Sequence, residues 1–581
     1  MPSLVSYPLL ALLPEISLTV ALLFTLMLSF SKKLSRSIWL CNLPFLLIGL
    51  IFCGQTFLAL ENNQAYFLFK GTFVLDGFAL LLKGLILLLL IAWNVFAGNF
   101  FHEPGEEINQ NKDSELLIAH RAEFQFLTLA LALGSCFLVS AYDFILAFIA
   151  LETISLSSIA LIGLAKLDKM GIEAALKYLL NGAIASAFFL FALSLIYGLT
   201  YGETNFAAFH SISPAILNQV FPYLVFCIAL LFLVLAVGYK LSLAPFHWWA
   251  PDVYNGASLP ATTILATISK IAALGIFVRF GMALFQISLP VSESAMFAPW
   301  WGFFAVLAIL SMVIGNLVGA RQLYRQNGSL KRLLAYSSIA QIGYIMTGIV
   351  IGSERSITQG IFYLVLYMLV NLAAFLGLMK LEEIYRAAQV RCQHPDDLNA
   401  LKGLVQVNPA LAVYLAICFA SLAGVLPSMV IAKFLLVNES LRLGISSVLP
   451  ADLLNSPLMA GLNQTLHFSF FVPPWLNLSM SITLLISSLV AIFYYFTLIK
   501  LIFIDSPLPE VKAILSKPQE FSYTTYISGA VCALLALSGL VLGLFPELVG
   551  RDISTKATQS IMISAANPIQ RVLGIEQALN P

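Results

Sequence analysis

A succession of apolar stretches, each long enough to cross a bilayer, constrains this chain more than any other feature. A transmembrane helix needs about 20 apolar residues. The mean hydropathy of the 581 residues is +0.93, with 60% of them apolar and 10% charged, which excludes a water-soluble fold. Fourteen spans are predicted, at residues 8–29, 38–60, 74–99, 124–141, 143–163, 175–200, 221–249, 259–285, 300–319, 333–352, 358–380, 409–437, 478–503 and 523–548.

Lysine and arginine fall unequally on the two sides of the predicted membrane. The connections on one side hold most of them, whereas the other side has only Lys70, Arg355, Arg442 and three residues of the C-terminal tail. The positive-inside rule makes the richer side the cytoplasm or its organellar equivalent, so both termini are expected outside. The net charge of +1 gives no reason to expect a nucleic-acid partner.

Three lysines and one glutamate lie deep within these apolar stretches. A charged group in the bilayer core costs roughly 2.5 kcal/mol or more and commonly serves ion or proton transfer. Glu152 lies near the middle of the fifth span and Lys270 near the middle of the eighth. Lys240 falls in the inner half of the seventh span, and Lys433 in the outer half of the twelfth. These four are candidate proton-transfer residues.

A buried carboxylate and a buried amine can control each other's charge. Each stabilises the charged form of the other, whereas burial alone favours the neutral forms. A lysine is therefore expected to release its proton when Glu152 moves away and to take one up when Glu152 approaches. Lysine suits this exchange better than arginine, because burial can bring the pKa of a lysine amine near neutral pH, whereas arginine stays charged.

Two prolines are predicted to break helices beside these lysines. Pro245 has no N–H for the carbonyl of Leu241, so an unwound turn is expected just after Lys240. Pro427 does the same to Ala423 in the twelfth span. Paired broken helices are typical of transporters with internal repeats, although proline kinks also occur without any transport function.

Other polar residues admit two interpretations. His247 could relay protons near neutral pH, or it could pack at the interface beside two tryptophans. Lys177 has Glu173 as an i,i+4 partner, and Lys83 and Asp76 are expected to pair on one helix face. Several hydroxyls could hold a file of water or simply bond to their own helix: Ser155, Ser157, Ser158, Thr262, Thr263, Thr267 and Ser269.

No pattern in the sequence indicates a cofactor or a metal ion. The seven cysteines are scattered, without a C-x-x-C pair, and are expected to pack as small apolar residues. A glycine loop of the phosphate-binding type is also missing. We therefore expect no cofactor, metal or redox centre on this chain.

Four segments resemble one protein family. These are FILAFIALETISL at 144–156, EAALKYLLNGAIASAFFLFALSLIYG at 173–198, YKLSLAPFHWWAPDVYNGAS at 239–258 and LKRLLAYSSIAQIGY at 330–344. They are similar to the antiporter-like subunit N of respiratory complex I, called subunit 2 in mitochondria, over about residues 70–505. The run PFHWWAPDVYNG is the most specific of these signals.

The resemblance implies an all-α polytopic membrane protein of about 14 transmembrane helices, with two inverted five-helix repeats and broken helices 7 and 12. The expected parts are a three-helix segment with an acidic loop (1–123), a first repeat (124–285), a second repeat (300–503) with an insertion at 438–477, and a last helix with a tail (504–581). The proton-transfer residues that match the family are Glu152, Lys240, Lys270 and Lys433, supported by Lys177 and His247.

Two positions depart from the family pattern. Gln341 stands where many relatives have histidine, and glutamine can orient water but cannot carry a proton at neutral pH. The twelfth-span motif reads AGVLPSMVIAK, with one proline and one glycine fewer and a shorter spacing before Lys433.

The expected function is therefore that of a proton-translocating membrane subunit of an NADH:quinone oxidoreductase, driven by quinone reduction elsewhere in the complex. Its expected partners are the other membrane-arm subunits, especially a neighbouring antiporter-like subunit and the small membrane subunits, together with lipids. A subunit of a multi-subunit cation/proton antiporter and an inactive structural scaffold are the alternatives. Similarity at 197–206 favours the mitochondrial inner membrane, while the charge bias also fits a bacterial plasma membrane or a thylakoid.

Overall fold

The structure, a computed structural model, is almost entirely helical. It describes residues 11–30, 38–59, 65–100, 120–164, 168–206, 219–285, 298–325, 328–387, 398–446, 473–507 and 552–566, and a few residues between 534 and 542. Within these residues, 12 helical segments are long and apolar enough to cross a membrane, and the shorter apolar helix α3 (Leu13–Ser29) matches the first predicted span. The chain is thus an all-α polytopic membrane protein. Most of the predicted span 523–548 lies outside the described residues, so the count of fourteen stays a prediction, as do the inverted repeats.

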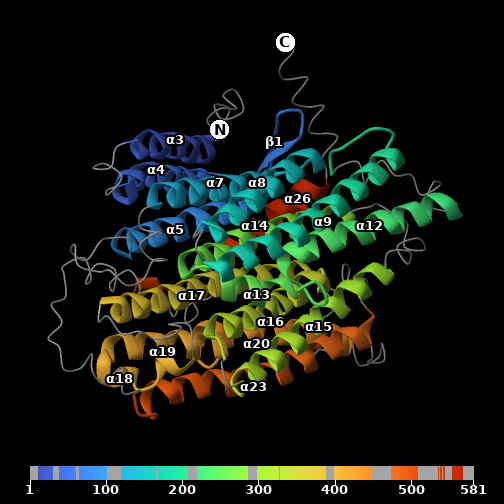
Figure 1. Ribbon diagram of the computed structural model, residues 1–581. Helices are drawn as coiled ribbons and strands as arrows, with labels where there is room; N and C mark the ends of the chain where they lie inside the picture. The colour runs from blue at the N-terminus through green and yellow to red at the C-terminus, as the bar shows by residue number, and fades with distance from the viewer. Residues whose placement is uncertain are drawn as a thin grey trace. The chain divides into compact units, whose positions relative to one another are not determined.

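The first of two compact units comprises residues 1–241, 256–290 and 556–581. Within it, α3, α4 and α5 follow one another, α7 packs on α3, α5, α8 and α14, and α9 packs on α8 and α12 (Figure 1). Its helices are α3, α4 (Ile38–Ala59), α5 (Gly77–Phe100), α7 (Arg121–Ser140), α8 (Phe144–Ile162), α9 (Lys169–Leu199), α12 (Val220–Leu241), α14 (Leu259–Phe285) and most of α26 (Asp552–Ala566).

The second unit comprises residues 242–255 and 291–555. Within it, α16 packs on α15 and α17, and α23 packs on α15, α19 and α20. Its helices are nearly all of α13 (Trp249–Gly256), α15 (Ala298–Gln322), α16 (Leu330–Ile351), α17 (Glu354–Ala387), the 3₁₀ turn η4 (Leu398–Leu401), α18 (Leu404–Val407), α19 (Pro409–Ala423), α20 (Pro427–Ser446) and α23 (Pro474–Phe503).

Burial separates the core helices from those at the periphery. The apolar windows of α14, α16 and α17 are 94% buried within the protein, whereas that of α9 is 28% buried and those of α4 and α23 are 33% buried. Large apolar side chains such as Leu180 and Ile184 of α9 are consequently exposed. The peripheral helices present a surface suited to lipid or to a neighbouring membrane subunit.

A short β-hairpin precedes α5, where the sequence predicted only helix from residue 74. Strand β1 (Tyr66–Leu68) pairs antiparallel with β2 (Phe73–Leu75), with Phe67 opposite Val74. The connecting turn places Phe69, Lys70 and Gly71 at positive φ. Glycine accepts this conformation without strain, whereas the other two residues accept it at some cost.

Both predicted helix breaks are present. Helix α12 ends at Leu241, one residue after Lys240, and α13 begins at Trp249. Helix α19 ends at Ala423 and α20 begins at Pro427. Gly424 terminates α19 in the left-handed region with φ of 81°, the backbone conformation that ends many helices. The second break therefore forms although its motif has one proline fewer than the family pattern.

The predicted pairing of Lys83 with Asp76 is wrong. Lys83 instead binds Glu15 of α3, with 2.6 Å between Nζ and Oε1, and both side chains are at most 2% exposed. Asp76 binds Arg279 of α14 through two hydrogen bonds of 3.0 and 3.1 Å. Each charge thus pairs with a partner on another helix, which the spacing along α5 could not reveal.

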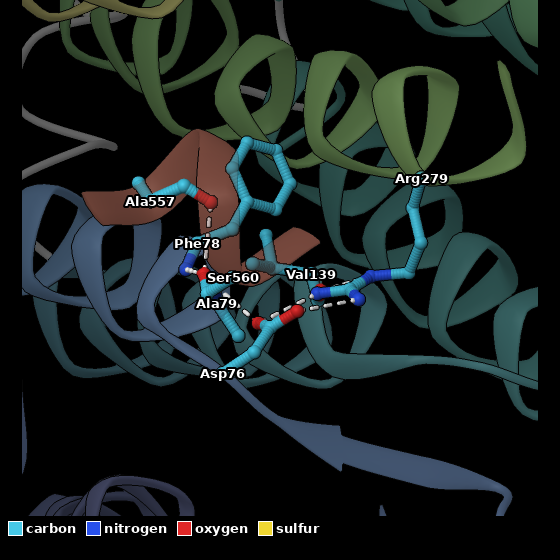
Figure 2. Close-up of polar contacts among 7 residues, drawn as sticks. All are labelled: Asp76, Phe78, Ala79, Val139, Arg279, Ala557 and Ser560. Carbon is cyan, nitrogen blue, oxygen red and sulfur yellow. Dashed lines mark hydrogen bonds and ion pairs between the residues drawn. The ribbon is translucent and has the colours of Figure 1, made fainter. Parts of the chain in front are cut away.

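The pair of Asp76 and Arg279 lies where three helices meet (Figure 2). Arg279 also donates to the carbonyl of Val139, at the end of α7, from Nε at 3.2 Å and from Nη2 at 3.0 Å. Asp76 accepts the N–H of Ala79 at 2.8 Å, and Ser560 of α26 accepts that of Phe78 at 3.0 Å. Unpaired N–H groups at a helix start need such acceptors, so both residues cap α5.

Candidate functional site

Glu152 lies in the middle of α8, and its carboxylate is bound by a neighbouring helix. The helix begins at Asp143, whose side chain accepts the N–H groups of Ile145 and Leu146 at 2.8 and 3.2 Å. This N-cap fixes the start of α8 and hence the depth of Glu152. The hydroxyl of Ser186, on α9, donates a short hydrogen bond to Oε1 of Glu152. The carboxylate is partly buried and oriented toward α9.

Lys240 reaches the same region from α12. Its Nζ donates a short hydrogen bond to Oγ of Ser155, which lies one turn after Glu152 on α8. The ammonium also lies 5.7 Å from the ring centroids of both Tyr178 and Tyr239, within the range of cation–π attraction. Ser155 uses its own proton on the carbonyl of Leu151 at 2.6 Å, which leaves an oxygen lone pair for the lysine.

Glu152 and Lys240 line the same small cavity. Among the described residues the two groups form no direct ion pair. The cavity has a volume of about 10 Å³, which is the size that admits about one water molecule. Its lining combines these two charged residues with a hydroxyl and apolar side chains: Phe148, Leu151, Glu152, Ala185, Ser186, Phe189, Ala236 and Lys240.

Lys270 lies in the most buried helix of the first unit. It belongs to α14 and is 1% exposed. The hydroxyls proposed to form a water file near it bond to their own helix: Thr267 donates to Thr263 at 2.7 Å, and Ser269 to Leu265 at 2.7 Å. This is the second of the two interpretations that the sequence allowed for these residues.

Lys177 and His247 lie in more open surroundings. Lys177 pairs with Glu173 one turn earlier, with 2.8 Å between Nζ and Oε1, and is 43% exposed. His247 lies in the turn between α12 and α13, where its ring faces that of Tyr336 at 6.4 Å. Its Nδ1 is buried and has no hydrogen-bond partner among the residues described.

Lys433 binds the carbonyl end of the broken helix α19. Its Nζ donates to the carbonyl of Ala423 at 3.2 Å and lies 4.8 Å from the ring centroid of Tyr344. The last carbonyls of a helix lack intrahelical donors and carry partial negative charge, so a cation is stabilised there. Gln341 donates to the preceding carbonyl, of Leu422, at 3.1 Å, and Tyr363 donates to Gln341.

The structure therefore brings the predicted residues together in part. Glu152 and Lys240 share one cavity, and Lys433 lies at the second helix break beside Gln341. Ser186 could not be predicted from the sequence, because it lies 34 residues from Glu152 along the chain and no local pattern marks it. Among the described residues, no three His, Cys, Asp or Glu side chains cluster as a metal site would require.

Apolar spans, two broken helices and buried lysines at or near the breaks define an antiporter-like membrane subunit. The comparisons with known proteins agree. A family model described as "NADH:quinone oxidoreductase/Mrp antiporter, TM" matches residues 141–454, and the chain belongs to this family. It is 31% identical over 563 residues to NAD(P)H-quinone oxidoreductase subunit 2 of Gloeobacter violaceus, covering 96% of this chain and 95% of that one. This confirms the resemblance to the antiporter-like subunits of complex I.

Solved structures support the same fold. A chain of respiratory complex I from Thermus thermophilus has a TM-score of 0.60 and 26% identity, covering 92% of this chain and 98% of that one. A chain of the Mrp complex from Dietzia sp. has a TM-score of 0.70 and 20% identity, covering 98% and 99%. The second likeness shows the fold alone.

Proposed function

We propose that this chain translocates protons across a membrane as a subunit of an NAD(P)H-quinone oxidoreductase. The observation that carries the proposal is the cavity that Glu152 and Lys240 share, where an acid and an amine line a space for about one water molecule. Related chains are subunits of such an oxidoreductase. Electron transfer belongs to other subunits in this proposal, and the chain itself carries no redox centre.

The proton exchange follows from the electrostatics of this cavity. When Glu152 is charged and close, it favours the protonated form of Lys240; when it is turned away, desolvation of the ammonium favours release of the proton. The released proton passes to water in the cavity and onward toward Lys270 and Lys433, with Lys177 and His247 as supporting groups. Quinone reduction elsewhere in the complex supplies the driving force.

Lys433 is the group that we place at the outer end of this route. Its ammonium lies against the carbonyl end of α19, which stabilises the proton, and among the described residues no carboxylate forms an ion pair with it. Release from this site is consequently less costly than release from a direct ion pair. Gln341 orients the broken helix and carries no proton itself.

The place and partners of the chain follow from its relatives and its surface. We assign it to the thylakoid or plasma membrane, because a relative with which it aligns over almost its whole length is cyanobacterial. This replaces the expectation of a mitochondrial inner membrane. The exposed apolar faces of α4, α9 and α23 suit contact with lipids and other membrane subunits, including a second antiporter-like subunit.

The family description, which also names the Mrp antiporter, fits one alternative, a subunit of a cation/proton antiporter that is not coupled to electron transfer. Variants Glu152→Ala and Lys240→Ala, in the assembled complex in sealed vesicles, separate the two functions. Loss of proton pumping driven by NAD(P)H oxidation, with Lys70→Ala on the exposed hairpin turn unaffected, is the expected result. Unchanged pumping in both variants refutes the proposal, and sodium-driven proton exchange without NAD(P)H supports the alternative.

A further inference from the structure

Ser186 differs from the other hydroxyl residues near the cavity in the target of its hydrogen bond. On α8, Thr153, Ser155 and Ser158 each donate to the carbonyl four residues earlier, at 2.9, 2.6 and 2.6 Å. This is the usual bond of a serine or threonine within an apolar helix. Ser186 instead donates across the interface of α8 and α9 to the Glu152 carboxylate.

The two charged groups of the cavity are therefore each bound to a serine rather than to each other. Glu152 and Ser155 are three residues apart on α8 and so lie on the same helix face. Ser186 draws the carboxylate toward α9, while Ser155 accepts from the Lys240 ammonium. Glu152, Ser186 and Lys240 all line the cavity of about 10 Å³.

We propose that Ser186 is a positioning residue that stabilises the separated state of Glu152 and Lys240, and that its hydroxyl sets the balance between this state and their direct ion pair. The inference rests on the proposed function, since it assigns a control element to the same site. In the separated state water can enter between the groups, and Lys240 can pass its proton to that water. In the direct pair the carboxylate holds the proton on the lysine.

The size of the effect follows from the chemistry of the bond. A hydrogen bond to a charged group changes an equilibrium by about ten- to a hundredfold. Ser186→Ala removes that bond and leaves the carboxylate with Lys240 as its remaining strong partner across the cavity. The direct pair then predominates, proton release from Lys240 slows, and turnover of the pump is limited by that step.

The test compares variants of α9 in the assembled complex in sealed vesicles. Ser186→Ala is expected to lower the rate of NAD(P)H-driven proton pumping by about tenfold and to shift the infrared carboxylate band that Glu152→Gln removes. Ser186→Thr, which keeps a hydroxyl, is expected to restore both. Ser194→Ala, which removes an exposed serine two turns further along the same helix, is expected to change neither.

Three outcomes overturn the inference. The inference is refuted if Ser186→Ala pumps protons at the wild-type rate, or if the infrared carboxylate band of Glu152 does not shift in that variant. Equal losses in Ser186→Ala and Ser186→Thr point to packing and also refute positioning. If the complex does not assemble with Ser186→Ala, Ser186→Cys replaces it. Cysteine is similar in size to serine but a weak hydrogen-bond donor, so the same slower pumping and shifted carboxylate band are expected. The proposed function fails separately, through unchanged pumping in both Glu152→Ala and Lys240→Ala.

Discussion

The buried pair of Asp76 and Arg279 gives a prediction about stability that can be worked out from its contacts. Arg279→Met removes four hydrogen bonds, two to Asp76 and two to the Val139 carbonyl. The carboxylate that remains is fully buried and keeps only the Ala79 N–H among the bonds shown in Figure 2. Breaking a buried ion pair from one side costs about 3–5 kcal/mol, because the other charge is left uncompensated.

Removing both charges should cost much less. Replacing a buried ion pair by apolar residues of similar volume is often neutral or stabilising, while loss of the Asp76 helix cap costs about 1 kcal/mol. We therefore expect Arg279→Met to lower the free energy of unfolding by about 3–5 kcal/mol, and the double variant Asp76→Leu with Arg279→Met to lower it by about 1 kcal/mol or less.

The assay is unfolding of the purified chain in detergent micelles by increasing sodium dodecyl sulfate, followed through the loss of helical circular dichroism. Lys70→Ala, on the exposed hairpin turn, serves as the control and should leave the transition unchanged. The reasoning is refuted if Arg279→Met is as stable as the wild type, or if the double variant is less stable than Arg279→Met.

Three further predictions concern the other charged residues. Lys83→Met should destabilise the chain by about 3–5 kcal/mol through the orphaned Glu15 carboxylate, and Glu15→Leu in the same chain should recover most of that loss in the same unfolding assay. Gly424→Ala should reduce proton pumping, because a Cβ there would lie 2.7 Å from Nζ of Lys433 at a φ of +81°; unaltered pumping would show that the ammonium position is unimportant. Lys177→Ala should change stability by only about 0.2–0.5 kcal/mol, since its exposed pair with Glu173 is local; a cost above about 2 kcal/mol would contradict that assignment.

Local sequence signals predicted the features that depend on local physics. Pro245 and Pro427 removed backbone donors within apolar spans, so both helix breaks could be placed to within a few residues. The apolar stretches predicted the membrane helices. Helix α9 starts before its predicted first residue, and α17 extends beyond both predicted ends, because polar residues continue each helix outside the apolar core. The hairpin before α5 was missed because each strand has only three residues and the second runs into the apolar stretch predicted as a span from residue 74.

Pairing between distant residues could not be predicted in the same way. Asp76 and Lys83 were expected to share a helix face, yet Asp76 caps the start of α5, and the two residues bind Arg279 and Glu15 of other helices respectively. Ser186 likewise contacts Glu152 across two helices. The choice of partner depends on how the helices pack, and a single sequence carries no direct record of that packing.

The claim that Glu152 and Lys240 exchange protons as one unit is tested most directly by a double-variant cycle. Pumped protons per NAD(P)H oxidised are measured for Glu152→Gln, Lys240→Met and the double variant in assembled complex. Residues that act as a unit give losses that do not add, so the double variant should pump no less than the worse of the two single variants. If the double variant instead loses pumping by the product of the two single losses, Glu152 and Lys240 act independently, which contradicts the account.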